Sequence, residues 1–123
     1  MKLTKEEAIK RHRLMWNWIA EETLRRKKCV DTIDAFKHFG WRDGYQIYHC
    51  WCCAYDRHHG NDCSRCPIKW PSKTNILQCI DYYPGLQGKG INNIWRRAVD
   101  NNDWRKAAYY AFYISMLPEN PDA

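Results

Sequence analysis

Apolar and polar residues alternate with the period of an α-helix over the first 28 residues. Thr4 and Glu7 have the spacing of a capping box, in which the Thr hydroxyl accepts from the Glu7 backbone N–H and the Glu7 carboxylate reaches back. One apolar stripe follows the cap: Ala8, Ile9, His12, Met15, Trp16, Ile19 and Thr23. Charged side chains lie mostly opposite this stripe: Lys10, Arg11, Arg13, Glu21 and Arg25. The pattern predicts a long helix that ends near Lys28.

Two apolar residues, Leu14 and Trp18, interrupt the polar side of this helix. Because they are four positions apart, they form an apolar pair away from the main stripe. Packing of this pair against the C-terminal helices is one interpretation. Contact with a partner molecule is the other.

A second, shorter helix is predicted after Asp31 or Thr32, since either residue can act as its N-cap. It carries three apolar residues: Ile33, Phe36 and Phe39. Gly40 is suited to the C′ position and ends the helix. Residues 41–49 are expected to lead irregularly, or as a short strand, into the cysteine region. Long regular elements are not expected in residues 50–79, because turn-forming residues recur there: Pro67, Pro71, Ser72 and Asn75.

Helical spacing returns at residue 91, with apolar side chains at i, i+3, i+4, i+7 and i+8: Ile91, Ile94, Trp95, Ala98 and Val99. Asn102 or Asp103 can cap a last helix. That helix is predicted from Trp104 to about Leu117, and Pro118 ends it.

The last helix is apolar nearly all round. One face has small residues that permit close helix–helix approach: Ala107, Ala108, Ala111 and Ser115. The other side carries large side chains: Tyr109, Tyr110, Phe112, Tyr113 and Met116. Such a helix is normally buried between layers or at an interface.

Four cysteines form two C-x2-C hooks separated by nine residues: Cys50 with Cys53 (the first hook) and Cys63 with Cys66 (the second hook). A hook bends the backbone so that two thiolates reach one ion, and two hooks supply the closed tetrahedral site that zinc prefers. The spacing predicts one structural Zn2+ with these four ligands. Cys52 and Cys79 remain alternatives to a member of this set.

Metal ligation is favoured over disulfides by the cysteine count and the expected compartment. Seven cysteines leave one thiol unpaired in any all-disulfide scheme. The sequence has no secretory leader and no apolar run of about 18 residues, so we expect a cytoplasmic protein. Disulfides are rare in a reducing cytosol. Cys29, at the end of the first helix, is interpreted as a small apolar residue.

These elements predict a mainly α fold in a single domain of residues 1–123. N-terminal helices (1–40) lead into an irregular zinc-stapled segment (41–83), a C-terminal helical hairpin (84–117) and a short acidic tail (118–123). We expect the hairpin to pack on the first helix.

The net charge of +6 favours acidic partners, and it is concentrated at the N-terminus, where residues 1–28 hold nine Lys or Arg against four Glu. One hypothesis is a nucleic-acid-binding zinc module whose first helix follows a phosphate backbone with Trp18 and six basic residues: Arg11, Arg13, Arg25, Arg26, Lys27 and Lys28. A second basic strip lies on the predicted hairpin: Lys89, Arg96, Arg97, Arg105 and Lys106. The solvated faces of ordinary helices are the other interpretation.

The sequence offers no catalytic constellation, so we predict no enzymatic activity and no catalytic residue. His58 and His59 lie between the hooks, where an exposed polar loop is the favoured interpretation. A redox role for C-x2-C needs a βαβ context that the pattern lacks. No P-loop and no G-x-G-x-x-G is present.

Four stretches together resemble small proteins encoded by phages and prophages of Gram-positive bacteria: HRLMWNWIAEE (12–22), CWCCAYD (50–56), CSRCPIKW (63–70) and NNDWRKAAYYA (101–111). The resemblance spans nearly the whole chain and implies origin. Small phage accessory proteins without a catalytic constellation are often inhibitors of host machinery, and anti-CRISPR proteins are a prominent class. Many of these inhibitors imitate DNA with acidic surfaces, whereas this chain is basic.

By analogy with such phage proteins, and not from the resemblance alone, we expect a monomeric, non-enzymatic inhibitor of a bacterial defence complex, most simply a CRISPR effector nuclease whose guide or target loading it blocks. Aromatic and Arg side chains dominate the binding energy of many interfaces. On that basis we predict seven partner-binding residues: Arg11, Leu14, Trp18, Arg25, Arg105, Tyr109 and Tyr113.

Overall fold

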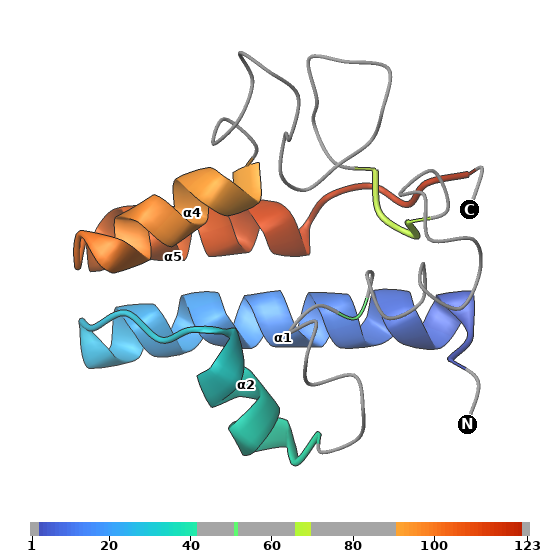
Figure 1. Cartoon of the computed structure of the whole chain (residues 1–123), viewed down its shortest axis with the longest axis horizontal. Coiled ribbons are helices and arrows are strands. Elements are labelled where there is room, and N and C mark those ends of the chain that lie inside the picture. Colours follow the sequence, from blue (N-terminus) through green and yellow to red (C-terminus); the bar gives the residue numbers. More distant parts are fainter. Residues whose placement is uncertain (1–2, 42–50, 52–65, 70–90, 122–123) are drawn as a thin grey trace.

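The computed structural model describes residues 3–41, 51, 66–69 and 91–121. Every named element in these ranges is a helix: α1 (Lys5–Arg26), α2 (Thr32–Phe39), α4 (Ile91–Asp100) and α5 (Trp104–Ser115) (Figure 1). The predicted mainly α fold is confirmed for this part of the chain. Most of the predicted zinc-stapled segment, residues 41–83, lies outside the described residues.

α1 begins and ends where its local sequence favours a helix end. The Thr4 hydroxyl accepts a hydrogen bond from the Glu7 backbone nitrogen at 3.1 Å. The Glu7 carboxylate accepts from Arg11 Nε at 3.0 Å. At the other end, Lys27 adopts a left-handed conformation with φ 52°, and its N–H returns to the Thr23 carbonyl. All seven residues of the predicted apolar stripe are buried, together with Ala20.

α2 has a complete capping box at its start. The Asp31 side chain accepts from the Asp34 backbone nitrogen at 3.1 Å, and the Asp34 carboxylate accepts from the Asp31 backbone nitrogen at 3.0 Å. Asp31 is therefore the cap, rather than Thr32. Gly40 ends the helix at φ 72°, a conformation that glycine adopts without a Cβ penalty. The predicted second helix is confirmed.

The predicted helical hairpin is formed by α4, a turn at residues 101–103, and α5. The Asp103 carboxylate accepts from the Lys106 backbone nitrogen at 3.3 Å, so Asp103 is the N-cap. Asn102 occupies the turn at φ 55°, a left-handed conformation that asparagine tolerates. α5 ends at Ser115, two residues before the predicted Leu117.

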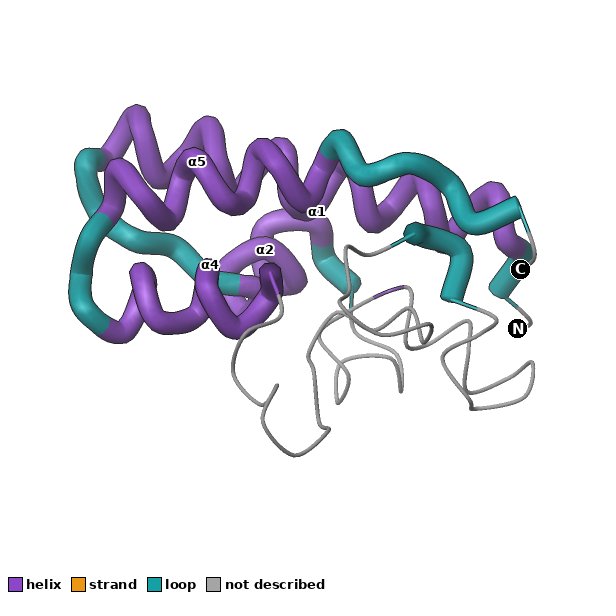
Figure 2. The backbone as a smooth tube through the Cα atoms, turned by 90° about the horizontal axis from the view of Figure 1, so that it is seen from above, coloured by secondary structure: helices purple, strands orange, loops and turns teal. Residues whose placement is uncertain are grey.

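α5 lies antiparallel along α1, and α4 packs beside α5 (Figures 1 and 2). Small side chains permit the close approach, since Ala107, Ala108 and Ala111 are at most 1% exposed. Trp16 of α1 and Trp95 of α4 meet edge to face, with ring centroids 4.7 Å apart. The predicted packing of the hairpin on the first helix is therefore confirmed.

Two side chains of α1 cap the C-terminal end of α5. His12 is fully buried, and its Nε2 donates to the Ile114 carbonyl at 3.0 Å. Arg13 Nη1 donates to the Ser115 carbonyl at 2.8 Å. The last carbonyls of a helix have no intrahelical donor, so these two bonds satisfy them and fix the register of α5 on α1.

The chain after α5 pairs with residues 66–69 (Figure 1). Two backbone hydrogen bonds form an antiparallel bridge between Ile68 and Glu119: Lys69 N donates to Pro118 O at 2.8 Å, and Asn120 N donates to Pro67 O at 2.7 Å. Residues 118–121, which the sequence marks only as part of an acidic tail, are therefore docked against the segment that ends the second hook.

Candidate functional site

One of the four predicted zinc ligands, Cys66, lies within the described residues. Its side chain is buried, with the residue 8% exposed, and its carbonyl oxygen accepts from Asn120 Nδ2 at 2.9 Å. The other three predicted ligands fall outside the described residues: Cys50, Cys53 and Cys63. The alternatives Cys52 and Cys79 also fall outside, as do His58 and His59. Within residues 3–41, 51, 66–69 and 91–121, no three His, Cys, Asp or Glu side chains cluster as metal ligands.

The second hook ends on a segment held by the helical body. Asn120 is 1% exposed and donates to two carbonyls of this segment, those of Cys66 and Pro67. Its own carbonyl accepts from Lys5 Nζ at 3.1 Å, which ties the segment to the start of α1. Ile68 is fully buried and joins the hydrophobic core. The backbone at Cys66 and Pro67 is thus held in place by hydrogen bonds to the C-terminal segment and, through it, to α1.

The first hook is anchored through Trp51, the residue that follows Cys50. Trp51 is fully buried and stacks on Phe36, with ring centroids 5.4 Å apart and an angle of 8° between the planes. Trp41 meets it edge-on at 5.0 Å. The Arg11 guanidinium lies 4.4 Å from the centre of its ring, within cation–π range. These four side chains form what we call the Trp51 cluster.

Trp51 of the first hook and Cys66 of the second are therefore both linked to the N-terminal half of α1, the one through Arg11 and the other through Asn120 and Lys5. These two contacts with one helix suit a shared ion, because the thiolates of both hooks would have to converge on one point. Four thiolates carry a double negative charge in excess of zinc, and the adjacent Arg65 and Lys69 in the sequence offset it. The donor set fits a closed structural zinc centre.

The predicted partner residues of α1 divide between its two flanks. Arg11 faces the Trp51 cluster and also binds Glu7, so its side chain is only 19% exposed. Trp18 is half-buried and stacks on His38 of α2, with ring centroids 4.6 Å apart. The interpretation that Trp18 packs on the C-terminal helices is therefore wrong, because α2 covers this flank. Leu14, on the other flank, is 45% exposed.

Much of the predicted basic face of α1 is engaged within the protein. Glu22 accepts from Arg25 Nε at 2.8 Å and from Arg26 Nε at 2.9 Å. These bonds, that from Arg25 foremost, lower the pKa of Glu22 from 4.5 to about 2. Arg11 and Arg13 also have partners, at the Trp51 cluster and at the end of α5. Less of the positive charge of this helix is available to a phosphate backbone than the sequence suggests.

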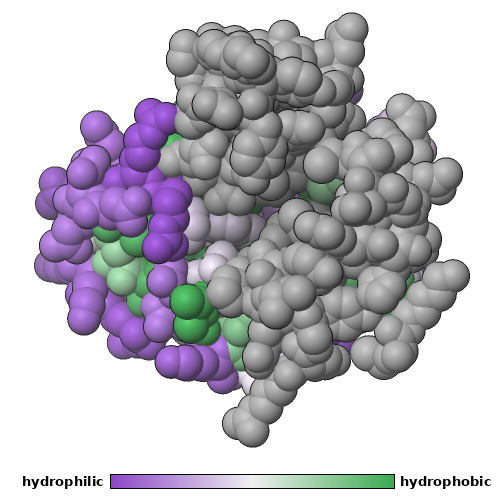
Figure 3. All heavy atoms as spheres, viewed as in Figure 1, coloured by the Kyte–Doolittle hydropathy of each residue, from purple (hydrophilic) through white to green (hydrophobic). Residues whose placement is uncertain are grey.

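Lys27 and Lys28 are exposed at the end of α1. This end lies beside the α4–α5 turn (Figure 1). Burial of the Cys29 thiol raises its pKa, and the negative charge of Asp103 in that turn raises it further. Figure 3 shows hydrophilic side chains gathered over this end of the molecule. Its exposed basic residues on the hairpin are Arg96, Arg97, Arg105 and Lys106.

Three large side chains on α5 and at its C-cap are exposed. Tyr109 is 65% exposed, Tyr113 is 40% exposed and Met116 is 72% exposed. Arg105 is exposed and lies over the ring of Trp104, 5.1 Å from its centre. The alanine face of this helix is thus buried, and Tyr110 and Phe112 are half-buried against the core. The large side chains left exposed are Tyr109 and Tyr113, with Met116 just beyond the end of the helix.

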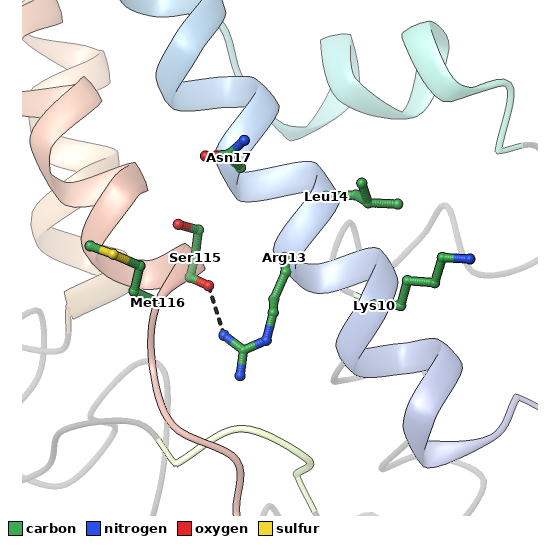
Figure 4. Close-up of a pocket in the computed structure, with 6 residues that line it drawn as sticks. All are labelled: Lys10, Arg13, Leu14, Asn17, Ser115 and Met116. Atoms are coloured by element: carbon green, nitrogen blue, oxygen red, sulfur yellow. Dashed lines mark hydrogen bonds between the residues drawn. The ribbon is translucent and has the colours of Figure 1, made fainter.

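A shallow groove of about 650 Å³ lies between α1 and the end of α5 (Figure 4). It is lined by Lys10, Arg13, Leu14, Asn17, Ser115 and Met116. Figure 4 shows Arg13 reaching across the groove to Ser115, with Leu14 and Met116 pointing to opposite sides. The groove is therefore polar and cationic at its centre and apolar at its margins. We call the groove with Leu14, Tyr109, Tyr113 and Met116 the α1/α5 surface.

Sequence reasoning missed two residues that hold the described part of the candidate site, Asn120 and Trp51. Asn120 has one local signal, since an Asn between two prolines is unsuited to a helix and has a side chain that can bond to backbone. Trp51 has another, since a Trp between two cysteines places an aromatic anchor inside a hook. In neither case does the local sequence indicate the distant contact.

None of the described helices is long and apolar enough to cross a membrane. Comparison of the chain with protein-family models, curated proteins and solved structures gives no match.

Proposed function

We propose that this chain is a non-enzymatic binding protein, held together by a structural Zn2+, which acts by docking on a protein complex. The observation that carries the proposal is the α1/α5 surface. A helix that exposes two tyrosines and a methionine beside a cationic groove has the composition of an interface core, in which aromatic residues, Met and Arg are enriched. Exposed apolar patches of this kind mark interaction sites more often than chance.

The metal in this proposal is architectural, with Cys50, Cys53, Cys63 and Cys66 as its ligands. It is supported by the spacing of the hooks and by the burial of Trp51 and Cys66 against the helical body. A closed four-thiolate site has no position left for water or substrate. Cobalt replacement tests this: a four-thiolate spectrum that is lost in Cys63→Ser supports the ligand set, and an unchanged spectrum in that variant refutes it.

The partner that we propose is a bacterial defence complex, and specifically a CRISPR effector nuclease whose guide or target loading is blocked. The support is the resemblance to phage-encoded proteins, together with a surface suited to protein contact. The inhibitor would act as a monomer in the cytoplasm of the bacterial host. Because the chain is basic, it would bind an acidic or mixed patch of the effector, or act by steric blocking, rather than imitate DNA.

The test is size-exclusion chromatography and target cleavage with a panel of CRISPR effectors, each with and without guide RNA. Co-elution and loss of cleavage are expected for one effector. Met116→Lys should weaken that complex at least tenfold, because it places a charge in the centre of the contact. Ile33→Lys is the matched control, since Ile33 is 46% exposed on α2, away from the α1/α5 surface. Absence of binding and inhibition across the panel would end this assignment.

A second candidate function, a nucleic-acid-binding zinc module of phage regulation or replication, is favoured by the basic end of the molecule. Lys27 and Lys28 are exposed there beside the exposed basic residues of the hairpin. This function requires duplex DNA or RNA binding that weakens steeply with salt, since each neutralised phosphate releases counterions. Lys27→Glu combined with Lys28→Glu should reduce the salt slope. Salt-insensitive binding would exclude it.

A further inference from the structure

The C-terminal segment grips the end of the second hook at two consecutive carbonyls. Asn120 Nδ2 donates to the Cys66 carbonyl at 2.9 Å, and its backbone nitrogen donates to the Pro67 carbonyl at 2.7 Å. Asn120 is 1% exposed, and Cys66 is 8% exposed. Figures 1 and 2 show residues 66–69 beside the chain that follows α5.

The grip is anchored on the helical body from two sides. Lys5 Nζ, at the start of α1, donates to the Asn120 carbonyl at 3.1 Å. Leu117, just after α5, is 5% exposed and belongs to the hydrophobic core. Asn120 therefore connects the backbone of Cys66 to α1, through Lys5, and to the end of α5, through the chain from Leu117.

An amide side chain suits this position because it carries a donor. The Cys66 carbonyl needs a donor, and the Asn120 NH2 group supplies one. Aspartate has the same shape but no donor when ionised, and alanine leaves the buried carbonyl without this bond. A buried acceptor that loses its partner is costly, so either substitution should release the hook backbone.

We propose that Asn120 is a positioning residue for the zinc centre, and that zinc binding and docking of residues 118–121 are coupled. The inference rests on the structural zinc proposed above. The direction of the Cys66 thiolate follows from the backbone at residues 66 and 67, and Asn120 holds both carbonyls of that backbone. Outer groups that orient metal ligands typically change metal affinity 10- to 100-fold. Because coupling between two binding events is reciprocal, zinc must also stabilise the docked C-terminal segment.

The first test is zinc affinity of the full chain, measured by competition with a chromophoric chelator. Asn120→Ala and Asn120→Asp should each bind zinc about 10- to 100-fold more weakly than the native chain. Lys5→Gln, which removes the outer anchor, should give a smaller loss in the same direction. Glu119→Gln is the matched control, since this exposed neighbour contributes through its backbone and should leave affinity unchanged.

The second test is amide hydrogen exchange of the native chain with zinc and after zinc removal. Protection at the amides of Lys69 and Asn120 should fall more than protection within α5. If Asn120 serves the fold alone and is not coupled to the zinc centre, zinc removal should reduce amide protection equally in both regions. Native zinc affinity in Asn120→Ala and Asn120→Asp, or equal loss of protection in both regions, overturns the coupling while leaving the zinc proposal standing. A native chain that binds no zinc overturns both.

Discussion

The two flanks of α1 carry similar residues and have opposite surroundings. On one flank, Arg11 and Trp18 are covered by the Trp51 cluster and by α2. On the other, Lys10 and Leu14 stand at the edge of an open groove. The sequence predicts Arg11, Leu14 and Trp18 alike as partner-binding residues, yet the structure encloses two of them. Aromatic and Arg residues indicate an anchor, but they do not indicate whether the anchor serves the fold or a partner.

The closed flank also explains how the fold supports the metal hypothesis. Trp51 comes from within the first hook and is buried between Phe36 and Arg11. The closed flank is therefore where Trp51, from the middle of the chain, meets the helices. Lys10 and Leu14 on the open flank have no such role among the described residues, so these two side chains can change at little cost to the fold.

The largest expected effect separating the two flanks comes from Trp51→Ala. Removal of this fully buried indole leaves a cavity beside Phe36, and such substitutions cost about 3–5 kcal/mol. Denaturant unfolding of the zinc-loaded chain measures the loss. Tyr109→Ala is the control, since a side chain 65% exposed should change stability by less than about 0.5 kcal/mol. Equal losses in the two variants would mean that Trp51 does not close this flank.

A direct comparison of the flanks uses Trp18→Ala and Leu14→Ala. Trp18 stacks on His38 at 4.6 Å and is half-buried, so its loss should cost about 1–2 kcal/mol. Leu14 is 45% exposed, and Ala is a better helix former, so its loss should stay within about 0.5 kcal/mol. In effector binding the order should reverse, with Leu14→Ala the more damaging. If Trp18→Ala is the less destabilising variant, the division of the flanks is wrong.

A smaller effect is expected from the charged pair at the same level of the helix, Arg11→Met and Lys10→Met. Methionine keeps the apolar stem but removes the cation above Trp51, which should cost about 1 kcal/mol in stability. Lys10→Met should have no measurable effect on unfolding, because Lys10 is exposed. Thermal unfolding of both variants at two salt concentrations checks this. A loss from Lys10→Met as large as that from Arg11→Met would contradict the assignment of Arg11 to the closed flank.

Local chemistry explains which parts of this fold are predictable from sequence. The caps Thr4 and Asp31, the stop at Gly40 and the buried stripe of α1 each depend on residues within a few positions of one another, and the structure confirms them. Asn120 and Cys66 are 54 positions apart, and no spacing rule selects that pair. The same holds for the contact between Arg11 and Trp51.

The candidate site also has a part that the local sequence predicts and a part that only the structure shows. The spacing of the hooks predicts the four zinc ligands, and ligation stays a prediction for all four, of which Cys66 alone lies within the described residues. What the structure adds is the support: a buried Trp51 at one hook and a buried Asn120 at the other. The exposed side of α5 was half-predictable, since an all-round apolar helix indicates an interface but not which face is free.

The smallest expected effect concerns the charged side chains at the end of α1, which are exposed to solvent and yet paired with each other. The Arg25 side chain is 67% exposed, yet Arg25 and Arg26 both donate to Glu22. The pKa of Glu22 falls from 4.5 to about 2 in the folded chain, chiefly through the bond from Arg25. A carboxyl with a depressed pKa stabilises the fold above its unfolded pKa, and that contribution is lost as the pH falls from 4.5 towards 2.

Glu22→Gln should therefore flatten the dependence of unfolding free energy on pH between 4.5 and about 2, with little change at neutral pH because exposed ion pairs contribute weakly. Glu21→Gln is the matched control, since this exposed neighbour bonds only to Asn17 among the described residues and should keep the native slope. Freeing both arginines should also strengthen any binding to duplex DNA at low salt. An unchanged pH dependence of unfolding free energy together with unchanged DNA binding in Glu22→Gln would mean that Glu22 does not engage Arg25 and Arg26 in solution. Both arginines would then be available to a partner at the basic end of α1.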